Sequence, residues 1–308
     1  MGRIGGLSVS ADGKRLIFWR VNTFPQAFLT EMDAETRRLR TPRRLTLDEN
    51  ENAATAWTPD SRAVLFASNR SGTYKLFRQP IDQVVPQVLV EGRSIFLPRL
   101  NPDGTQILYL AGFNSRDTAI PQSVMRVPLQ GGSPRVVLQR PFITNFQCAR
   151  SPSKLCLVDR LEGSTMQFFS FDPEDGETRG FASFQVVGNS FGWSLSPDGS
   201  KLALILGGPE HRVTFMTVSD RSTHEVELKQ WPIENIDWAA DGKSVFVASR
   251  NASGAPVIFG VEPNGDYREL LGGDGFTQYL WAVPSPDGRY IALEVVTGAN
   301  NVWMVENF

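Results

Sequence analysis

Cysteine and histidine are scarce in this sequence of 308 residues, which contains two of each. Two cysteines cannot form a framework of several disulfides or a zinc site with four cysteine ligands. Cys148 and Cys156 flank the short segment SPSK at 151–154. We therefore expect both on adjacent strands as small buried residues, which leaves a disulfide between them open. The cysteine content does not indicate a redox compartment.

A surplus of charge of one sign is also missing. The chain has 31 basic and 33 acidic residues, so its formal net charge of −2 provides no attraction to nucleic acid or an anionic membrane surface. The exception is RRLRTPRR at 37–44, which has five arginines but no aromatic residue for base stacking. We interpret this run as a solvated rim. Nucleic-acid binding there is the alternative, and salt-dependent binding would reveal it.

Long apolar runs are absent as well. No run approaches the roughly 18 residues that a membrane-spanning helix requires. The N-terminal segment MGRIGGLSVS lacks the charged and apolar regions of a signal peptide. The sequence therefore predicts a segment without a membrane span. Its hydrophobic content of 41% is that of an ordinary globular protein and argues against disorder.

A short turn motif, in contrast, occurs seven times. The copies are SADG (10–13), TPDS (58–61), NPDG (101–104), SPS (151–153), SPDG (196–199), AADG (239–242) and SPDG (285–288). Successive copies are 43–50 residues apart, which is the period of a four-stranded propeller blade. Proline presets φ, aspartate binds the backbone two residues on, and glycine adopts positive φ. We interpret the aspartates as turn residues rather than calcium ligands, because their neighbours are apolar strands.

The residues after each turn alternate between apolar and other side chains, as Leu202 and Leu204 do after the turn 196–199. This period of two is typical of strands with one buried face. Two more short strands follow in most repeats, and neither a helix pattern nor a linker is evident. We therefore predict one all-β domain over 1–308, a seven-bladed β-propeller of four-stranded antiparallel blades, with six blades as the alternative.

The chain ends bear on how such a ring closes. Only eight residues precede Val9, too few for an outer strand and its loop, and the last repeat stops at NVWMVENF (301–308). In a closed propeller the N-terminal strand usually completes the last blade and hides two sheet edges. We therefore expect the N-terminal closing strand to be missing and the chain to be a segment of a longer protein.

The string WTPDSRAVLFASNRSGTYKLFR (57–78) resembles the WD40-like repeat of TolB-type β-propellers. That repeat has a tryptophan, Ser-Pro-Asp-Gly, an apolar strand, Ser-Asn-Arg-x-Gly and a further strand, and the last repeat of this chain fits it too. Such repeats occur in periplasmic proteins of the Tol-Pal system and in bacterial proteins that join a propeller to a winged-helix DNA-binding domain or a Ser/Thr kinase. The resemblance implies a partner-recognition or sensor role and favours a periplasmic or extracytoplasmic location. The fourth repeat departs most, with Arg150 at a usually apolar position.

Motifs for catalysis are weak. GNSFG (188–192) matches the nucleophile elbow G-x-S-x-G, but a strand and a turn are expected after it instead of a helix. His211 and His224 fall in loops expected on opposite faces, so neither a catalytic triad nor a shared metal site is predicted. No phosphate-binding loop is present. We predict a non-catalytic binding domain without metal or cofactor; the alternative is a propeller enzyme or a propeller domain that accompanies a hydrolase.

The segments that lead from one blade to the next supply the candidate binding residues. In a propeller they surround one mouth of the central channel, where a rigid scaffold often holds a binding site. We interpret most aromatic residues there as packing between blades, and favour the polar ones as ligand contacts. The predicted contacts, to a protein or a small ligand and not to nucleic acid, are Asn52, Arg93, Asn145, Asn189, Trp231, Glu234, Asn235, Gln278 and Tyr279.

Overall fold

Each turn motif joins two antiparallel strands in the computed structural model, which describes residues 3–92, 94–112, 120–188, 190–208, 211–228, 231–273 and 277–306. The seven hairpins are β1–β2 (Arg3–Val9, Arg15–Glu31), β4–β5 (Asn52–Trp57, Ala63–Ser68), β8–β9 (Ile95–Leu100, Gln106–Ala111), β12–β13 (Phe146–Cys148, Cys156–Glu162), β16–β17 (Gly192–Leu195, Lys201–Ile205), β20–β21 (Trp231–Trp238, Val245–Arg250) and β24–β25 (Thr277–Pro284, Tyr290–Glu306). The predicted hairpins are confirmed, although the first strand of the fourth has only three residues.

The turn aspartates have the local partners that turn chemistry predicts. Asp198 Oδ1 accepts hydrogen bonds from Ser196 Oγ (2.7 Å) and from the backbone N–H of Ser200 (2.9 Å). Gly199 has a φ of 75°, a conformation that glycine adopts without steric cost. Ser61, which replaces this glycine in the second repeat, also has a positive φ of 60°. The aspartates are therefore turn residues.

The described strands form six sheets. Five sheets follow the chain, as β4–β7, β8–β11, β12–β15, β16–β19 and β20–β23. Their two outer strands are β6 and β7 (Lys75–Pro80, Gln87–Val90), β10 and β11 (Gln122–Pro128, Arg135–Arg140), β14 and β15 (Thr165–Phe171, Thr178–Gln185), β18 and β19 (Arg212–Thr217, Thr223–Glu227), and β22 and β23 (Pro256–Val261, Tyr267–Gly272). The predicted all-β propeller of four-stranded antiparallel blades is confirmed. The described strands form six sheets, which is the number of blades given as the alternative to seven.

The sixth sheet joins strands from both ends of the chain. Its order is β24, β25, β2 and the short β3 (Arg43–Arg44), with β1 paired to the first part of β2. β25 and β2 pair along 17 residues, from Tyr290 opposite Glu31 to Glu306 opposite Arg15. The expectation of a missing closing strand is wrong, because β2 and β3 take the outer positions of the last blade. The first repeat thus adds its hairpin to this sheet instead of forming a seventh blade.

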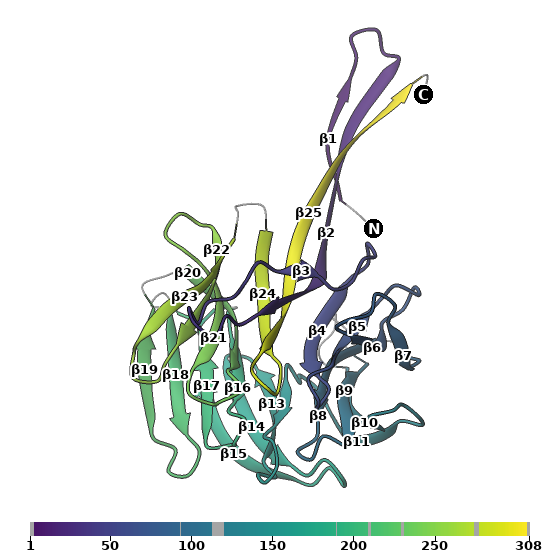
Figure 1. The fold of residues 1–308 in the computed structure, drawn as a ribbon. Helices are drawn as coiled ribbons and strands as arrows, with labels where there is room; N and C mark the ends of the chain where they lie inside the picture. Colours follow the sequence, from purple (N-terminus) through teal and green to yellow (C-terminus); the bar gives the residue numbers. More distant parts are fainter. Residues whose placement is uncertain are drawn as a thin grey trace.

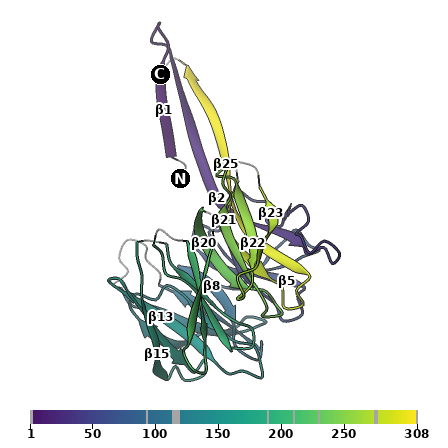
Figure 2. The same ribbon diagram turned by 90° about the vertical axis from the view of Figure 1, so that its left-hand side faces the viewer.

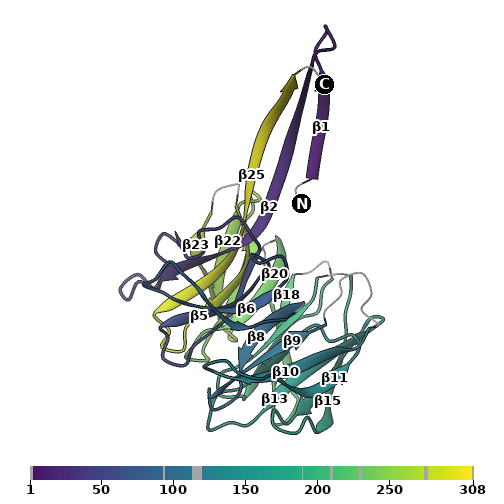
Figure 3. The same ribbon diagram turned by 90° about the vertical axis from the view of Figure 1, so that its right-hand side faces the viewer.

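Part of the sixth sheet projects from the ring as a three-stranded arm (Figures 1, 2 and 3). The arm consists of β1, the first part of β2 and the last part of β25, beyond the point where β24 pairs. Strand register places one set of apolar side chains on the same face of the arm. These side chains are half-buried or exposed: Leu7, Val9, Leu16, Phe18, Trp303 and Val305.

The hydrophobic core lies between adjacent blades. Trp57 of β4 packs in one cluster with Trp281 and Val283 of β24, and its Nε1–H donates to the carbonyl of Val283 (2.9 Å). Trp238 of β20 donates in the same way to the carbonyl of Ser194 on β16 (2.9 Å). Each indole thus contributes buried apolar surface and a hydrogen bond to the neighbouring blade.

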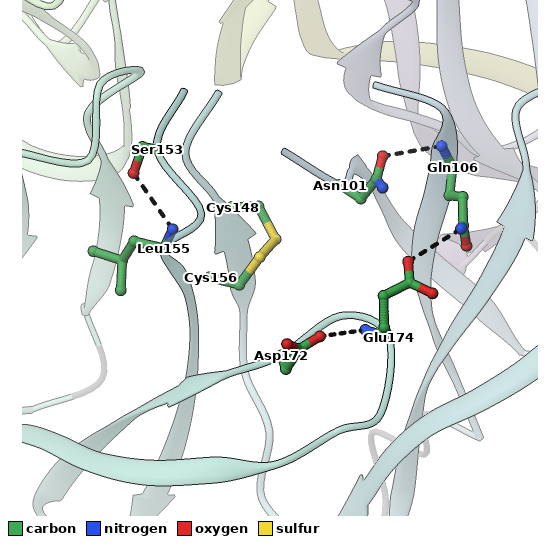
Figure 4. The surroundings of a disulfide bond; sticks show 8 residues. All are labelled: Asn101, Gln106, Cys148, Ser153, Leu155, Cys156, Asp172 and Glu174. Atoms are coloured by element: carbon green, nitrogen blue, oxygen red, sulfur yellow. Dashed lines mark hydrogen bonds between the residues drawn. A yellow bond between two sulfur atoms is a disulfide. The ribbon is translucent and has the colours of Figure 1, made fainter. Parts of the chain in front are cut away.

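Cys148 and Cys156 are directly opposite each other on β12 and β13 and form a disulfide (Figure 4). The turn between them retains Ser153, whose Oγ accepts a hydrogen bond from the backbone N–H of Leu155 (3.4 Å). The placement on adjacent strands is confirmed, and the disulfide that the sequence left open is present.

Candidate functional site

Six inner strands surround the axis of the ring. β4, β8, β12, β16, β20 and β24 contact their neighbours in this order, and β24 contacts β4, so the ring is closed. Each inner strand begins at one end of the ring and leads into a hairpin turn at the other. We call these the loop end and the turn end. The arm extends beyond the loop end, where β25 continues past β24.

At the loop end, Asn52 is fully buried at the start of β4. Its Nδ2 donates to the Oδ1 of Asp48 (3.2 Å) and to the carbonyl of Asn50 (2.8 Å), and its Oδ1 accepts from Nη2 of Arg70 (2.8 Å). Arg70 also pairs with Asp48 (2.7 Å). This network closes the loop before β4, so Asn52 holds the backbone of the channel mouth in place.

Asn145 belongs to a second network at this end, centred on Asp159. The buried carboxylate of Asp159 accepts hydrogen bonds from the backbone N–H groups of Thr144 (2.7 Å) and Asn145 (2.8 Å), and from Nε1 of Trp193 (2.8 Å). Burial raises the pKa of Asp159, and these hydrogen bonds oppose the rise. The Nδ2 of Asn145 donates to the carbonyl of Trp193 (3.2 Å), which links two blades.

Some of the remaining predicted contacts pack or form hydrogen bonds within the chain, and two lie outside the described residues. Gln278 Nε2 donates to Glu234 Oε1 between β24 and β20 (3.1 Å), Asn235 Oδ1 accepts from the backbone N–H of Ile236 (2.8 Å), and Tyr279 is buried. Trp231 begins β20, while Arg93 and Asn189 lie outside the described residues. Five of the predicted contacts thus have hydrogen-bond partners within the chain, namely Asn52, Asn145, Glu234, Asn235 and Gln278. The role of the predicted residues as ligand contacts stays a prediction.

A pocket of about 300 Å³ opens at the turn end. All six blades contribute to its wall, so it lies on the axis of the ring. Its apolar lining comes mainly from turn prolines and inner-strand tryptophans, namely Pro59, Pro102, Pro197, Pro284, Pro286, Trp57 and Trp238. Its charged lining consists of two arginines, Arg99 and Arg150, and two aspartates, Asp103 and Asp237. We call it the turn-end pocket.

A bulge in β8 directs Arg99 into this pocket. The register with β9 shifts between Phe96 and Arg99, and the intervening Leu97 has a φ of 48°; such bulges often re-aim a side chain. The Arg99 side chain is 9% exposed. Its Nη1 donates to the carbonyl of Thr55, and its guanidinium carbon lies 4.8 Å from the ring centroid of Trp281. Nε and Nη2 are buried without a hydrogen-bond partner among the described residues.

Asp237 of β20 faces Arg99 from the opposite side of the ring, with 3.8 Å between Oδ2 and Nη1. Its Oδ1 accepts hydrogen bonds from Ser194 Oγ (2.8 Å) and from the backbone N–H of Trp238 (2.9 Å). Burial raises the pKa of Asp237, while the charge of Arg99 and, less strongly, that of Arg150 oppose the rise. The carboxylate is thus held mainly by its own side of the ring.

Arg150 lies at the mouth of the pocket and is exposed. Its Nη1 donates to the carbonyl of Pro286 (3.2 Å), and its backbone N–H donates to the carbonyl of Pro197 (2.7 Å). The residue that made the fourth repeat unusual therefore bridges three turns and adds a second positive charge to the turn-end pocket.

The motifs tested for catalysis do not form a site in the part of the chain that the structure describes. Ser190 of GNSFG donates to the carbonyl of Ile233 (2.8 Å), and strand β16 follows where a nucleophile elbow needs a helix. His224 lies in β19 rather than in the loop expected for it, with Nε2 at 2.8 Å from the carbonyl of Pro263. The described residues contain no group of three histidine, cysteine or acidic residues placed to hold a metal ion.

The arginines of the run 37–44 make contacts within the chain. Arg40 pairs with Asp33 (3.3 Å) and Glu31 (3.5 Å), and Arg44 Nη2 donates to Gln26 Oε1 (2.7 Å). Two of the five residues, Arg43 and Arg44, form β3 at the edge of the sixth sheet. The run thus supports the closing strand of the ring.

Arg99 and Asp237 were not among the binding residues predicted from the sequence. Both stand two positions before a turn motif, where the other repeats from the second onward have Ala56, Ala149, Ser194 and Val283. When the repeats are aligned, a charged residue at this inner-strand position is the feature that could have identified Arg99 and Asp237. Because the two charges belong to opposite blades, only the closed ring brings them together.

No family model matches the sequence, and no curated protein matches it. Solved structures do resemble the fold. TolB from Acinetobacter baumannii aligns with a TM-score of 0.64 and 17% identity over 81% of this chain, which spans 64% of that protein. A TolB-type protein from Agrobacterium tumefaciens aligns with a TM-score of 0.67 and 16% identity over 89% of this chain and 99% of its own length.

A puromycin hydrolase also aligns, with a TM-score of 0.53 and 15% identity over 96% of this chain and 58% of the hydrolase. At these identities the likeness concerns the fold alone, and it includes proteins named as enzymes. The chain therefore has a TolB-like β-propeller fold, as the repeats predict. None of the described residues forms a helix long and apolar enough to cross a membrane.

Proposed function

We propose that this chain is a non-catalytic recognition domain that binds a protein partner at the turn end of its channel. The observation that carries the proposal is the turn-end pocket, where all six blades meet around the charge pair of Arg99 and Asp237. A concave site on a rigid ring, lined by apolar residues and several polar groups, is a common arrangement for binding. The fold likeness to TolB supports this proposal by analogy.

Site-specific photo-crosslinking tests the proposal. A photoreactive residue replaces Ser151, an exposed residue of the pocket lining, or Glu49, an exposed loop-end residue that serves as the control. We expect a saturable crosslink from position 151 to a defined protein in an extract of the source cells, abolished by an excess of the unmodified chain. Equal crosslinking from position 49, or none from position 151 at saturating extract, would contradict the proposal.

The proposal also includes the absence of catalysis. Purified chain is incubated with aminoacyl p-nitroanilides and p-nitrophenyl esters, which represent the hydrolase class. It is also incubated with oligogalacturonate, because a structure named as an oligogalacturonate lyase aligns with this chain as well (TM-score 0.54, 18% identity). We expect turnover no faster than in buffer. Turnover that scales with the concentration of the chain and is lost on substitution of a channel residue would establish an enzyme instead.

We further propose an extracytoplasmic location. The support is the disulfide between Cys148 and Cys156, since such bonds persist in oxidising compartments and are rare in the cytosol. Alkylation of acid-quenched cells with a mass-tagged thiol reagent measures the oxidation state directly. We expect both cysteines to be protected from the reagent until a reductant is added, and immediate labelling of both would contradict the proposed location.

A further inference from the structure

We infer that the turn-end pocket binds a carboxylate group of the partner through the side edge of the Arg99 guanidinium, with Arg150 as a second cation at the mouth. This inference rests on the proposed function and specifies the chemistry of the same site. Its starting point is that Nε and Nη2 of Arg99 are buried and unpartnered among the described residues. Buried polar groups nearly always have hydrogen-bond partners, so a buried arginine edge without one points to a ligand.

The geometry of the free edge selects the ligand group. Nε–H and one N–H of Nη2 lie on the same side of the planar guanidinium and point in parallel. This spacing matches the two oxygens of a carboxylate, which forms two parallel charge-assisted hydrogen bonds with such an edge. The remaining nitrogen, Nη1, is already bound to the carbonyl of Thr55.

Asp237 does not occupy this edge. Its nearest approach is to Nη1, at 3.8 Å, and its Oδ1 is held by Ser194 and Trp238. The face of the guanidinium lies on the ring of Trp281, which fixes its plane before any ligand arrives. The orientation of Arg99 is thus fixed, but Nε and Nη2 have almost no accessible surface, so a carboxylate reaches them only when the side chains that cover them move.

The pocket favours a small, singly charged group. Its volume of about 300 Å³ is at the lower limit for ligand pockets, enough for one acidic side chain or a chain end. The turn prolines form an apolar collar, which strengthens a charge-assisted hydrogen bond by excluding water. The nearby negative charge of Asp237 repels a doubly charged phosphate more strongly than a carboxylate.

Short peptides test the carboxylate directly. The probes are acetyl-Gly-Glu-Gly-amide and its Gln counterpart, acetyl-Gly-Gly-Gly with a free or an amidated C-terminus, and inorganic phosphate. Binding is followed by ¹H–¹⁵N correlation of the arginine Nε–H groups, with Arg99 assigned by the Arg99→Lys variant. We expect saturable movement of the Arg99 signal with at least one carboxylate probe, at an affinity about tenfold or more above its uncharged counterpart and above phosphate.

The two peptide pairs separate the possible sources of the carboxylate. A response to the Glu peptide alone assigns an acidic side chain, whereas a response to the free C-terminus alone assigns a chain end. Equal affinity for charged and uncharged probes would overturn the inference. Because crosslinking from position 151 does not depend on a carboxylate, the proposed function can survive that result.

Variants test the assignment to residues. Arg99→Lys keeps a charge but loses the parallel edge, and we expect about tenfold weaker binding of the responding probe. Arg150→Gln, at an exposed position, is expected to weaken it about threefold, and Asp237→Asn to strengthen it about threefold by removing the repulsive charge. Arg62→Gln, an exposed turn residue outside the pocket lining, is the matched control and should bind like the original chain.

Thermal unfolding is measured for every variant. If Arg99→Lys does not fold, the opposite effects of Arg150→Gln and Asp237→Asn decide the question, because a purely structural charge pair would not make one substitution weaken and the other strengthen binding. Unchanged affinity in both variants would overturn the inference.

Discussion

Two arginines at opposite ends of the ring differ in the partners they have. Arg70 at the loop end stacks on Phe77 (4.9 Å), and its Nε and Nη2 reach Ser68, Asn52 and Asp48. Arg99 at the turn end also stacks on an aromatic ring, yet its Nε and Nη2 have no partner among the described residues. A polar residue near a channel mouth therefore indicates binding only when its hydrogen-bonding groups are not already paired within the fold.

The comparison predicts that the loop end matters for stability more than for binding. The largest effect is expected for Asp159→Ala, which removes a buried carboxylate and leaves the N–H groups of Thr144, Asn145 and Trp193 without their acceptor. We expect a loss of about 3–5 kcal/mol in the free energy of unfolding, measured by urea denaturation. A loss below about 1 kcal/mol would show that this network is not the structural support described here.

The second effect is a pH dependence of stability caused by the raised pKa of one buried glutamate, Glu294. Burial of Glu294 on β25, and then the charge of Glu51, raise the pKa of Glu294 to about 7. Because the folded state retains this proton to higher pH than the unfolded chain, the associated stability is greatest below about pH 4.5 and falls as the pH rises to about 7. The loss is at most about 3 kcal/mol, and Glu294→Gln should flatten that part of the pH profile of urea unfolding. An unchanged profile in the variant would contradict this assignment.

The smallest effect is expected for Asn52, which binds Arg70 at the loop end. Asn52→Ala deletes one acceptor of Arg70 Nη2 and leaves its ion pair with Asp48 in place. We expect about 1–2 kcal/mol lower stability by urea denaturation. The affinity of the responding carboxylate probe should not change, because the substitution lies at the other end of the ring. Weaker probe binding by the folded variant would show that the two ends are coupled.

Much of the fold was predictable because it is specified locally. Asp198 and Gly199 determine their turn through contacts within a few residues, and the same chemistry recurs in each repeat, so seven hairpins follow from the sequence. The number of blades was not fixed in this way. It depends on the pairing of β2 with β25, whose residues are more than 250 positions apart in the chain.

The candidate site was less predictable for a physical reason. Asn52 and Asn145 were chosen as polar residues near a channel mouth, but their partners come from other loops and blades and are evident only in the folded chain. Arg99 and Asp237 leave a trace in the sequence as charges at one repeat position. Which atoms of Arg99 remain unpartnered depends on the bulge in β8 and on the ring of Trp281.

One titration compares both ends of the ring in the same sample. The Nε–H signals of Arg70 and Arg99 are recorded while acetyl-Gly-Glu-Gly-amide or acetyl-Gly-Gly-Gly with a free C-terminus is added, with the uncharged counterparts as controls. We predict that the Arg99 signal moves saturably with a carboxylate probe and that the Arg70 signal stays in place, because its donors are already bound. A stationary Arg99 signal with every carboxylate probe, or equal movement of both signals, would show that the edge of Arg99 does not bind a carboxylate selectively.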